Sequence, residues 1–263
     1  MFTLRQYLLA LLDSRGLTRT LGEIDVCRDE QGRPCFSAGN SAAVFRIRLG
    51  GRIRSLRCYL RPMRHLKEIY GQRLLEKELY LHTSPETGVW VDTVLGDWIE
   101  GSTLHETVAQ AAALRDRESL QILVRLFDRL ALALVTDNRA HGDLKPENII
   151  VGDDGTLCPI DFDASYLPAF AGEISPELGT AAYQHPARTA ADFDERIDDY
   201  PSALISTALH ALAEDPTLWD RYGSSDGLLY TPQRIASDPA YRETLALFEK
   251  RGMAVQYRIA QLL

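Results

Sequence analysis

The sequence predicts an α+β fold of two lobes, a small β-rich first lobe and a larger helical second lobe. Residues 22–61 alternate short apolar runs with turn residues, which is typical of strands and hairpins. Residues 118–136 instead place leucines at helical spacing over a wide apolar face. The 263 residues suffice for a sizeable core in a two-lobed unit. We place the boundary after residue 96, so that residues 1–96 form the first lobe and residues 97–263 the second.

The composition is that of an ordinary globular protein, with 45% hydrophobic and 25% charged residues. A formal net charge of -8 argues against a nucleic acid or an anionic membrane as partner. The 4 cysteines show no C-x-x-C spacing, which indicates reduced thiols of a cytoplasmic protein. No run approaches the ~18 apolar residues of a membrane span. The opening residues predict an amphipathic helix, with Leu4, Leu8 and Leu11 on one face, and no signal peptide.

The first lobe contains one segment of small residues, Ser37–Val44, between two strand-like runs. Small residues at such a turn let backbone N–H groups approach a phosphate closely, although a plain hairpin has the same composition. Further along, Gly50-Gly51 predicts a tight hairpin. Apolar residues then recur at helical spacing within residues 64–75, which predicts the core helix of this lobe.

The most informative stretch is HGDLKPENIIVGDDGTLCPIDFD, residues 141–163. Its Asp-Asp-Gly, residues 153–155, predicts a two-residue hairpin turn between antiparallel strands over residues 149–151 and 157–160. The returning strand would bring Asp161 beside Asn148. Amide and carboxylate oxygens are hard ligands, so this pair predicts a site for Mg²⁺ held together with nucleotide phosphates.

Two further side chains precede these strands in the same stretch. Asp143 could accept the proton of a substrate hydroxyl group, and Lys145 could neutralise a phosphoryl group. A charged hairpin without chemistry is the simpler interpretation. Because so many positions are specified in one register, we favour a phosphoryl-transfer site.

HGDLKPEN resembles the H-R-D-x-K-x-x-N catalytic loop of protein kinases, with Gly142 in place of the Arg. IDFD resembles the Asp-Phe-Gly motif, with Asp163 in place of the Gly; that carboxylate could add a metal ligand or repel phosphate. GTAAYQHP, residues 179–186, is similar to the kinase G-T-x-x-Y-x-x-P element, with Ala187 where a Glu belongs. The resemblance spans roughly residues 36–213 and is strongest to small bacterial Ser/Thr protein kinase-like proteins.

The resemblance also implies nucleotide contacts in the first lobe. Residues 37–44 are similar to the glycine-rich loop, which implies contacts from Gly39, Asn40 and Val44. Arg57 stands where kinases carry a Lys. Its planar fork is not equivalent to a compact ammonium group, so it could bridge phosphates to a helix Glu or block the site. Glu68 is the expected partner, with Glu76 as the alternative and a solvated surface glutamate as the simpler interpretation.

Residues 89–101 resemble the kinase hinge, which implies backbone contacts to adenine from Asp97 and Ile99 and a slot wall from Trp98. Trp98 could equally be a core residue. Around the catalytic loop, the resemblance gives His141 and Asp198 structural roles, with Asp198 bracing the loop backbone. Capping of the following helix is the alternative for Asp198 or its neighbour.

Three functions are compatible with these residues. The first is an ATP- and Mg²⁺-dependent Ser/Thr protein kinase with a protein substrate. The second is a nucleotide-binding pseudokinase that regulates a protein partner, which Arg57 and Asp163 favour over the first. The third is a small-molecule phosphotransferase, because Gly142 also resembles the H-G-D loops of aminoglycoside-kinase-like enzymes. LKPEN and the G-T-x-x-Y-x-x-P element favour a protein kinase over this third function.

Overall fold

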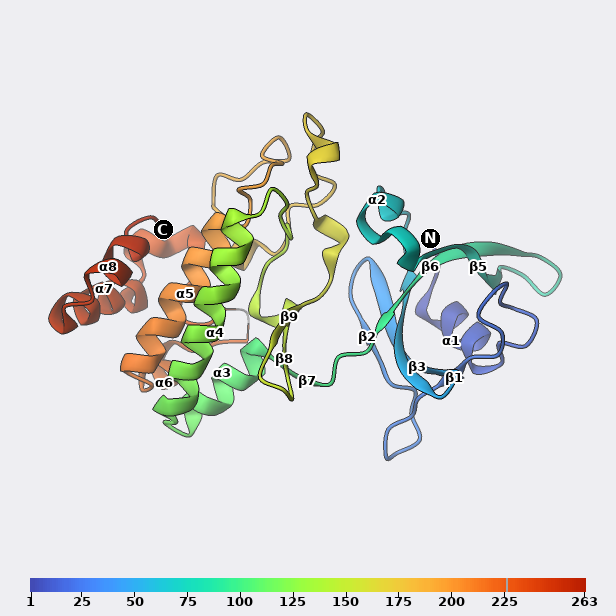
Figure 1. Cartoon of the computed structure of the whole chain (residues 1–263), viewed down its shortest axis with the longest axis horizontal. Coiled ribbons are helices and arrows are strands. Elements are labelled where there is room, and N and C mark those ends of the chain that lie inside the picture. Colours follow the sequence, from blue (N-terminus) through green and yellow to red (C-terminus); the bar gives the residue numbers. More distant parts are fainter. Residues whose placement is uncertain (226) are drawn as a thin grey trace. The chain divides into compact units, whose positions relative to one another are not determined.

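The computed structural model describes residues 1–225 and 227–263 and confirms the predicted α+β class (Figure 1). The chain divides into two compact units, Met1–Trp98 and Ile99–Leu263. The first unit contains an antiparallel sheet and the second is mostly helical. None of the helices formed by the described residues combines the length and apolar character that a membrane crossing requires.

The first unit is built on a six-stranded sheet in the order β1-β3-β4-β6-β5, with β2 also paired to β3. Its strands are β1 (Asp25–Val26), β2 (Phe36–Ala38), β3 (Ala42–Leu49), β4 (Arg52–Tyr59), β5 (Leu74–His82) and β6 (Gly88–Asp97). The predicted hairpin at Gly50-Gly51 is confirmed between β3 and β4. Both glycines have positive φ, 55° and 80°, as a two-residue turn between twisted strands requires.

The predicted opening helix is also confirmed, as α1 (Leu4–Leu12). Thr3 caps it, with a reciprocal hydrogen bond from the backbone of Thr3 to the Gln6 side chain. The helix packs Tyr7 and Leu11 against the sheet, and the Tyr7 hydroxyl donates to the backbone oxygen of Tyr59 at 2.6 Å. This packing secures α1 to the buried core of the first unit.

The predicted helix over residues 64–75 is confirmed only in its first half. Only α2 (Leu66–Tyr70) is helical, followed by a 3₁₀ turn, η1 (Gly71–Arg73), and then by β5. Gly71 has φ 53° and ψ -125°, which ends the helix. Leu74 and Leu75 pair with β6, opposite Val94 and Thr93. Sheet pairing has therefore overridden helical spacing in the second half of this segment.

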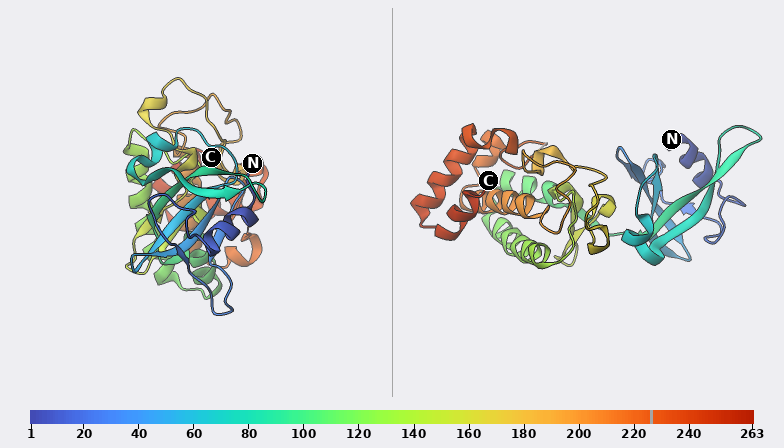
Figure 2. Two further views of the ribbon diagram at one scale, coloured as in Figure 1. Left: turned by 90° about the vertical axis from the view of Figure 1, so that its right-hand side faces the viewer. Right: turned by 90° about the horizontal axis from the view of Figure 1, so that it is seen from above.

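The second unit combines helices with a small sheet in the order β7-β8-β9. Its strands are β7 (Gly101–Thr103), β8 (Ile149–Gly152) and β9 (Leu157–Pro159), and its α-helices are α3 (Leu104–Ala113), α4 (Arg117–Thr136), α5 (Asp199–Glu214), α6 (Leu218–Tyr222), α7 (Pro239–Arg251) and α8 (Ala254–Ala260). The predicted long helix is confirmed as α4, which packs beside α5 (Figures 1 and 2). Thr103 caps α3 with Glu106 as its reciprocal partner.

The predicted antiparallel return of β9 along β8 is confirmed, with Ile149 opposite Pro159. The connecting turn is longer than the two residues expected. The N–H of Gly155 donates to Gly152 O at 2.8 Å, and the N–H of Gly152 donates to Thr156 O at 2.9 Å. The Asp154 carboxylate accepts hydrogen bonds from Thr156, which favours this wider turn.

Candidate functional site

The side chains of Asp143 and Lys145 converge on one residue, Thr180, within the second unit. Asp143 Oδ1 accepts a hydrogen bond from the Thr180 N–H at 2.5 Å. Lys145 Nζ donates to Thr180 Oγ1 at 2.9 Å and lies 3.7 Å from Asp143 Oδ2. The two side chains are 19% and 23% exposed, so both remain accessible to a substrate. A carboxylate and an ammonium group are thus held close together by one residue, which lies 37 positions after Asp143 and 35 after Lys145.

Asn148 lies at the end of the 3₁₀ turn η2 (Pro146–Asn148), directly before β8. Its Nδ2 donates to Asp143 O at 2.9 Å and lies 3.3 Å from Asp143 Oδ2. The amide oxygen accepts no hydrogen bond from any described residue. The backbone oxygen of Asn148 accepts a hydrogen bond from the N–H of Ile160 at 2.8 Å. Ile160 directly precedes Asp161, so this bond brings the chain before Asp161 next to Asn148.

Asp161 has the left-handed backbone conformation, with φ 68° and ψ 64°. This conformation is uncommon for a residue other than glycine and is found disproportionately at functional sites. The next residues form the 3₁₀ turn η3 (Phe162–Ala164), in which Asp163 is only 3% exposed. The carboxylate of Asp163 is therefore held inside the fold of the second unit.

Asn148 and Asp161 provide a donor set that suits Mg²⁺, because both offer hard oxygen atoms. Within the described residues, no group of three or more His, Cys, Asp and Glu side chains could hold a metal. The donor set of Asn148 and Asp161 contains only one such residue. If these two residues held Mg²⁺, phosphate oxygens and water would have to supply its remaining ligands.

His141 fixes the loop from within. Its Nε2 lies 2.7 Å from Ile160 O, and its Nδ1 lies 3.3 Å from Asp143 N. A neutral ring with the proton on Nε2 satisfies both partners, since Nε2 then donates and Nδ1 accepts. The side chain is buried, and its ring centroid is 5.0 Å from that of Phe162. The ring therefore connects the start of the loop to the end of β9.

Asp198 supports the same loop from the start of α5. Its carboxylate accepts hydrogen bonds from the backbone N–H groups of His141 and Gly142, the latter at 3.0 Å. The side chain is buried, with 1% exposure. The Asp198 side chain makes no capping hydrogen bond to α5. Its carboxylate instead binds the backbone of the loop.

Gly142 occupies a position that admits no side chain. Its φ is 81°, and a Cβ atom placed there would lie 2.0 Å from the backbone oxygen of Ala164. The Ala164 carbonyl of η3 therefore occupies the space that a side chain at position 142 would need. This contact explains physically why a glycine stands where the resembling kinase loops carry an arginine.

Arg188 is a residue that the motifs did not identify. Its guanidinium donates to Gly142 O at 3.0 Å and to Gln184 Oε1. Burial lowers the pKa of Arg188, and the nearby carboxylates of Asp198 and Asp143 act in the opposite direction. A cation thus reaches the loop from a later segment. Its sequence signal is weak, because it lies two positions beyond the recognisable G-T-x-x-Y-x-x-P element.

The nucleotide-contact candidates of the first unit lie along the β2–β3 turn and β4. Gly39 and Asn40 are exposed in that turn, where the Gly39 N–H donates to Ala42 O at 2.9 Å. Val44 in β3 lies directly opposite Arg57 in β4. The Arg57 guanidinium is 5.8 Å from the centroid of the Tyr59 ring.

Neither of the two glutamates expected to pair with Arg57 has a described contact with it. Glu68 is exposed in the first turn of α2 and forms no ion pair with any described residue. Glu76 forms an ion pair with Lys67 at 3.3 Å. The pairing of Arg57 with either glutamate therefore stays a prediction.

The hinge candidates lie at the end of the first unit and the start of the second. Asp97 ends β6, and its backbone oxygen accepts the Ser55 hydroxyl at 3.1 Å. Trp98 is half-buried and lines an open hollow of about 550 Å³ with Phe36 and Pro34. Ile99 begins the second unit. Trp98 therefore lies at a surface hollow of the first unit rather than in its core.

The chain is similar to several Ser/Thr protein kinases. It is 28% identical over 171 residues to CBL-interacting protein kinase 17 of Oryza sativa subsp. japonica, covering 62% of this chain and 35% of that protein. It is 35% identical over 113 residues to serine/threonine-protein kinase PknL of Mycobacterium tuberculosis, covering 41% and 27%. It is 25% identical over 160 residues to serine/threonine-protein kinase chk1 of Schizosaccharomyces pombe, covering 59% and 31%. No protein-family model matches the chain.

The α+β architecture and these similarities support the resemblance to the protein kinase-like superfamily that the sequence predicted. At the level of that family, the similarities support a phosphotransferase. The chain spans about a third or less of the length of these curated relatives, 35%, 27% and 31%.

Proposed function

We propose that the protein is an ATP-dependent Ser/Thr protein kinase-like phosphotransferase. The observation that carries this proposal is the convergence of Asp143 and Lys145 on Thr180. The Thr180 N–H holds Oδ1 of Asp143, while Oδ2 lies 3.3 Å from Asn148 Nδ2 on a side chain that is 19% exposed and would accept a hydrogen bond from a substrate hydroxyl group. That oxygen would take the hydroxyl proton as the phosphoryl group is transferred.

Lys145 supplies positive charge within 3.7 Å of the same carboxylate. Such a cation stabilises negative charge on a transferring phosphoryl group. Asn148 and Asp161 are the residues that would hold Mg²⁺, which when bound with ATP neutralises charge on the phosphates. In the first unit, the candidates for nucleotide contacts are those that the resemblance implies: Gly39, Asn40, Val44, Arg57, Glu68, Asp97 and Trp98, followed by Ile99 of the second unit.

A pseudokinase is the second candidate, because two specific residues favour it. Arg57 replaces a compact ammonium group by a wider guanidinium on β4, and Asp163 adds a buried carboxylate two residues after Asp161. A nucleotide-binding module with a regulatory protein partner would need neither efficient phosphate positioning nor turnover. A small-molecule phosphotransferase is the third candidate, supported by Gly142.

Thermal unfolding with Mg-ATP tests nucleotide binding. At ~100-fold excess over Kd, the nucleotide should stabilise the protein by about 2.7 kcal/mol and raise its melting temperature by roughly 5–10 °C. Magnesium without nucleotide is the control. No shift with any nucleotide would reject both phosphotransferase candidates together.

A second experiment tests phosphoryl transfer. Asp143→Asn should abolish phosphorylation of candidate proteins, or of the chain itself, detected by mass spectrometry. It should leave the Mg-ATP thermal shift intact, because the substitution preserves shape and removes only the base. Asp153→Asn, in the exposed turn after β8, is the matched control and should retain transfer. A thermal shift without transfer by the wild-type protein would favour the pseudokinase.

A further inference from the structure

We propose that Cys27 and Cys35 form an oxidisable thiol pair that closes into a disulfide when the protein meets a peroxide. Both are free thiols in the structure. They flank a seven-residue excursion, residues 28–34, that projects between β1 and β2. This site lies in the first unit and is independent of the catalytic chemistry proposed above.

The backbone brings the two cysteines next to each other. Arg28 and Pro34 form an isolated antiparallel bridge, and one further step in its register would set Cys27 across from Cys35. The Cys35 N–H donates to Cys27 O at 2.8 Å, which confirms that the two backbones are adjacent at this point. The excursion is therefore a small hairpin with one cysteine on each side of its base.

Both cysteines are also fixed on the same residue of β3. The Cys27 N–H donates to Arg46 O, and the Arg46 N–H donates to Cys35 O, each at 2.9 Å. The neighbouring pairs continue each register, with Val26 opposite Ile47 and Phe36 opposite Phe45. Residues directly opposite each other in a ladder project from the same face of the sheet. Cys27 and Cys35 therefore share the face of Arg46.

The spacing that this pairing implies suits a disulfide. Directly opposed residues of an antiparallel ladder have Cα atoms about 4.5–5.5 Å apart. Disulfides connect Cα atoms about 4.4–6.8 Å apart. Closure of the bond therefore requires side-chain rotation and no rearrangement of the strands.

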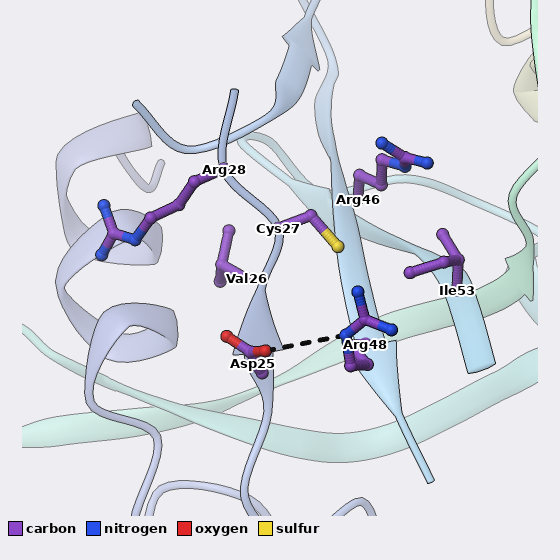
Figure 3. Close-up of a pocket in the computed structure, with 7 residues that line it drawn as sticks. All are labelled: Asp25, Val26, Cys27, Arg28, Arg46, Arg48 and Ile53. Carbon is purple, nitrogen blue, oxygen red and sulfur yellow. Dashed lines mark ion pairs between the residues drawn. The ribbon is translucent and has the colours of Figure 1, made fainter. Parts of the chain in front are cut away.

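Both thiols are accessible to a small oxidant, because each is partly exposed and lines an open hollow. Cys27 lines a hollow of about 400 Å³, into which its side chain points, toward Arg46 and Arg48 (Figure 3). Cys35 lines the neighbouring hollow together with Trp98, whose ring centroid is 5.6 Å from the Arg46 guanidinium.

The other two cysteines provide internal comparisons. Cys58 is fully buried in the core of the first unit, and burial raises the pKa of its thiol. It should therefore resist oxidation in the folded protein. Cys158 is partly exposed in β9 of the second unit and belongs to a different compact unit from the thiol pair.

The reaction with hydrogen peroxide balances in two steps. The sulfur of one cysteine attacks a peroxide oxygen, breaking the O–O bond and giving a sulfenic acid and one water molecule. The second thiol then attacks that sulfur, forming the S–S bond and releasing a second water molecule. The two thiols lose two electrons and two protons in total, and the peroxide is reduced to water.

Peptide mapping of the full chain tests the proposal directly. The protein is treated with equimolar hydrogen peroxide, its remaining thiols are alkylated, and it is digested with trypsin without reduction. Cleavage after Arg28 separates the two cysteines, while the Arg33-Pro34 bond resists trypsin. We expect one cross-linked species containing residues 20–28 and 29–46, lower in mass by two hydrogens than the sum of its peptides, and lost after reduction.

Variants assign the bond and its effect on stability. Cys27→Ser and Cys35→Ser should each abolish the cross-link, whereas Cys58→Ser and Cys158→Ser should retain it. Oxidation should raise the melting temperature of the wild-type protein and leave that of Cys27→Ser unchanged, because the bond restricts the unfolded chain. Full alkylation of both thiols after peroxide treatment, or their separate conversion to sulfinic acids, would overturn the proposal.

Discussion

The Asp198 carboxylate accepts the backbone N–H of Gly142 at 3.0 Å, linking the start of α5 to a loop 56 residues earlier in the chain. The same carboxylate accepts the N–H of His141. Two buried donors thus depend on one buried acceptor. Such groups are costly to leave unsatisfied, about 1–3 kcal/mol each. The conformation of the candidate catalytic loop therefore depends on a residue outside the loop.

Asp198→Ala should lower the free energy of unfolding by about 2–4 kcal/mol, because both donors lose their partner without access to bulk water. Urea unfolding followed by circular dichroism measures this loss. Asp199→Ala is the matched control at an adjacent, exposed carboxylate in the first turn of α5. It should cost no more than about 1 kcal/mol, the size of a helix-dipole contribution. Equal losses for the two variants would contradict the bracing role.

Gly142→Ala should be the more damaging of two glycine substitutions with similar backbone conformations. Gly142 and Gly155 have φ of 81° and 78°, but only Gly142 faces a close backbone atom, Ala164 O. Gly155→Ala should cost about 1–2 kcal/mol from left-handed strain alone. Gly142→Ala adds an overpacking cost of ~1–3 kcal/mol, for a total of about 2–5 kcal/mol.

Thermal or urea unfolding of both variants checks this difference. Both positions have a left-handed backbone, so the strain of placing alanine there is common to the two variants. The difference between their stability losses therefore reports the steric conflict at Gly142. If the two alanine variants lost the same stability, the close approach of the loop to η3 would have no energetic importance.

Local patterns predicted those parts of the fold in which local and tertiary preferences agree. Helix α4 has a continuous apolar face, and the β3–β4 hairpin has the Gly50-Gly51 turn that its strands require. The same patterns failed at residues 64–75, where the spacing of Leu66, Ile69 and Leu74 suits a helix but β6 offers a pairing partner. Sequence spacing does not reveal such a partner.

The candidate site divides in the same way. The hairpin of β8 and β9 brings Ile160, the residue before Asp161, alongside Asn148, and the sequence predicted this antiparallel return. Arg188 reaches Gly142 O across 46 residues, and no local periodicity signals that contact. The sequence likewise does not reveal that position 142 requires glycine. That requirement arises from the backbone oxygen of Ala164, which lies in a separate turn.

Arg57→Lys tests the largest departure from the resembling kinases and depends on the proposed function. We expect the variant to bind Mg-ATP more tightly or to turn it over faster, because an ammonium group is the compact cation found at that kinase position. Isothermal titration and phosphate-transfer assays measure the two effects. Arg52→Lys, at the exposed start of the same strand, should change neither. A large loss in Arg57→Lys would show that the guanidinium itself is the working cation.

The pair formed by Asp128 and His210 should make stability depend on acidic pH. Asp128 in α4 accepts hydrogen bonds from His210 Nε2 at 2.9 Å and from Ser206 Oγ at 2.8 Å, both in α5. Burial raises the pKa of Asp128, but the hydrogen bonds from His210 and Ser206 outweigh it and hold that pKa below its usual value. The folded state therefore favours the ionised carboxylate more than the unfolded state does.

The resulting stabilisation is fully present above the ordinary Asp pKa of about 3.9, and it is lost as the pH falls through the lower pKa of the folded state. Asp128→Asn should thus be less stable than the wild-type protein at pH 6, with a difference that begins to shrink near pH 4 and shrinks further as the pH falls. Melting temperatures across this range measure the convergence. Glu118→Gln, an exposed substitution on the same helix, should keep the wild-type pH dependence. A constant difference between Asp128→Asn and the wild-type protein at every pH would mean that the contact acts through packing and not through the charge of Asp128.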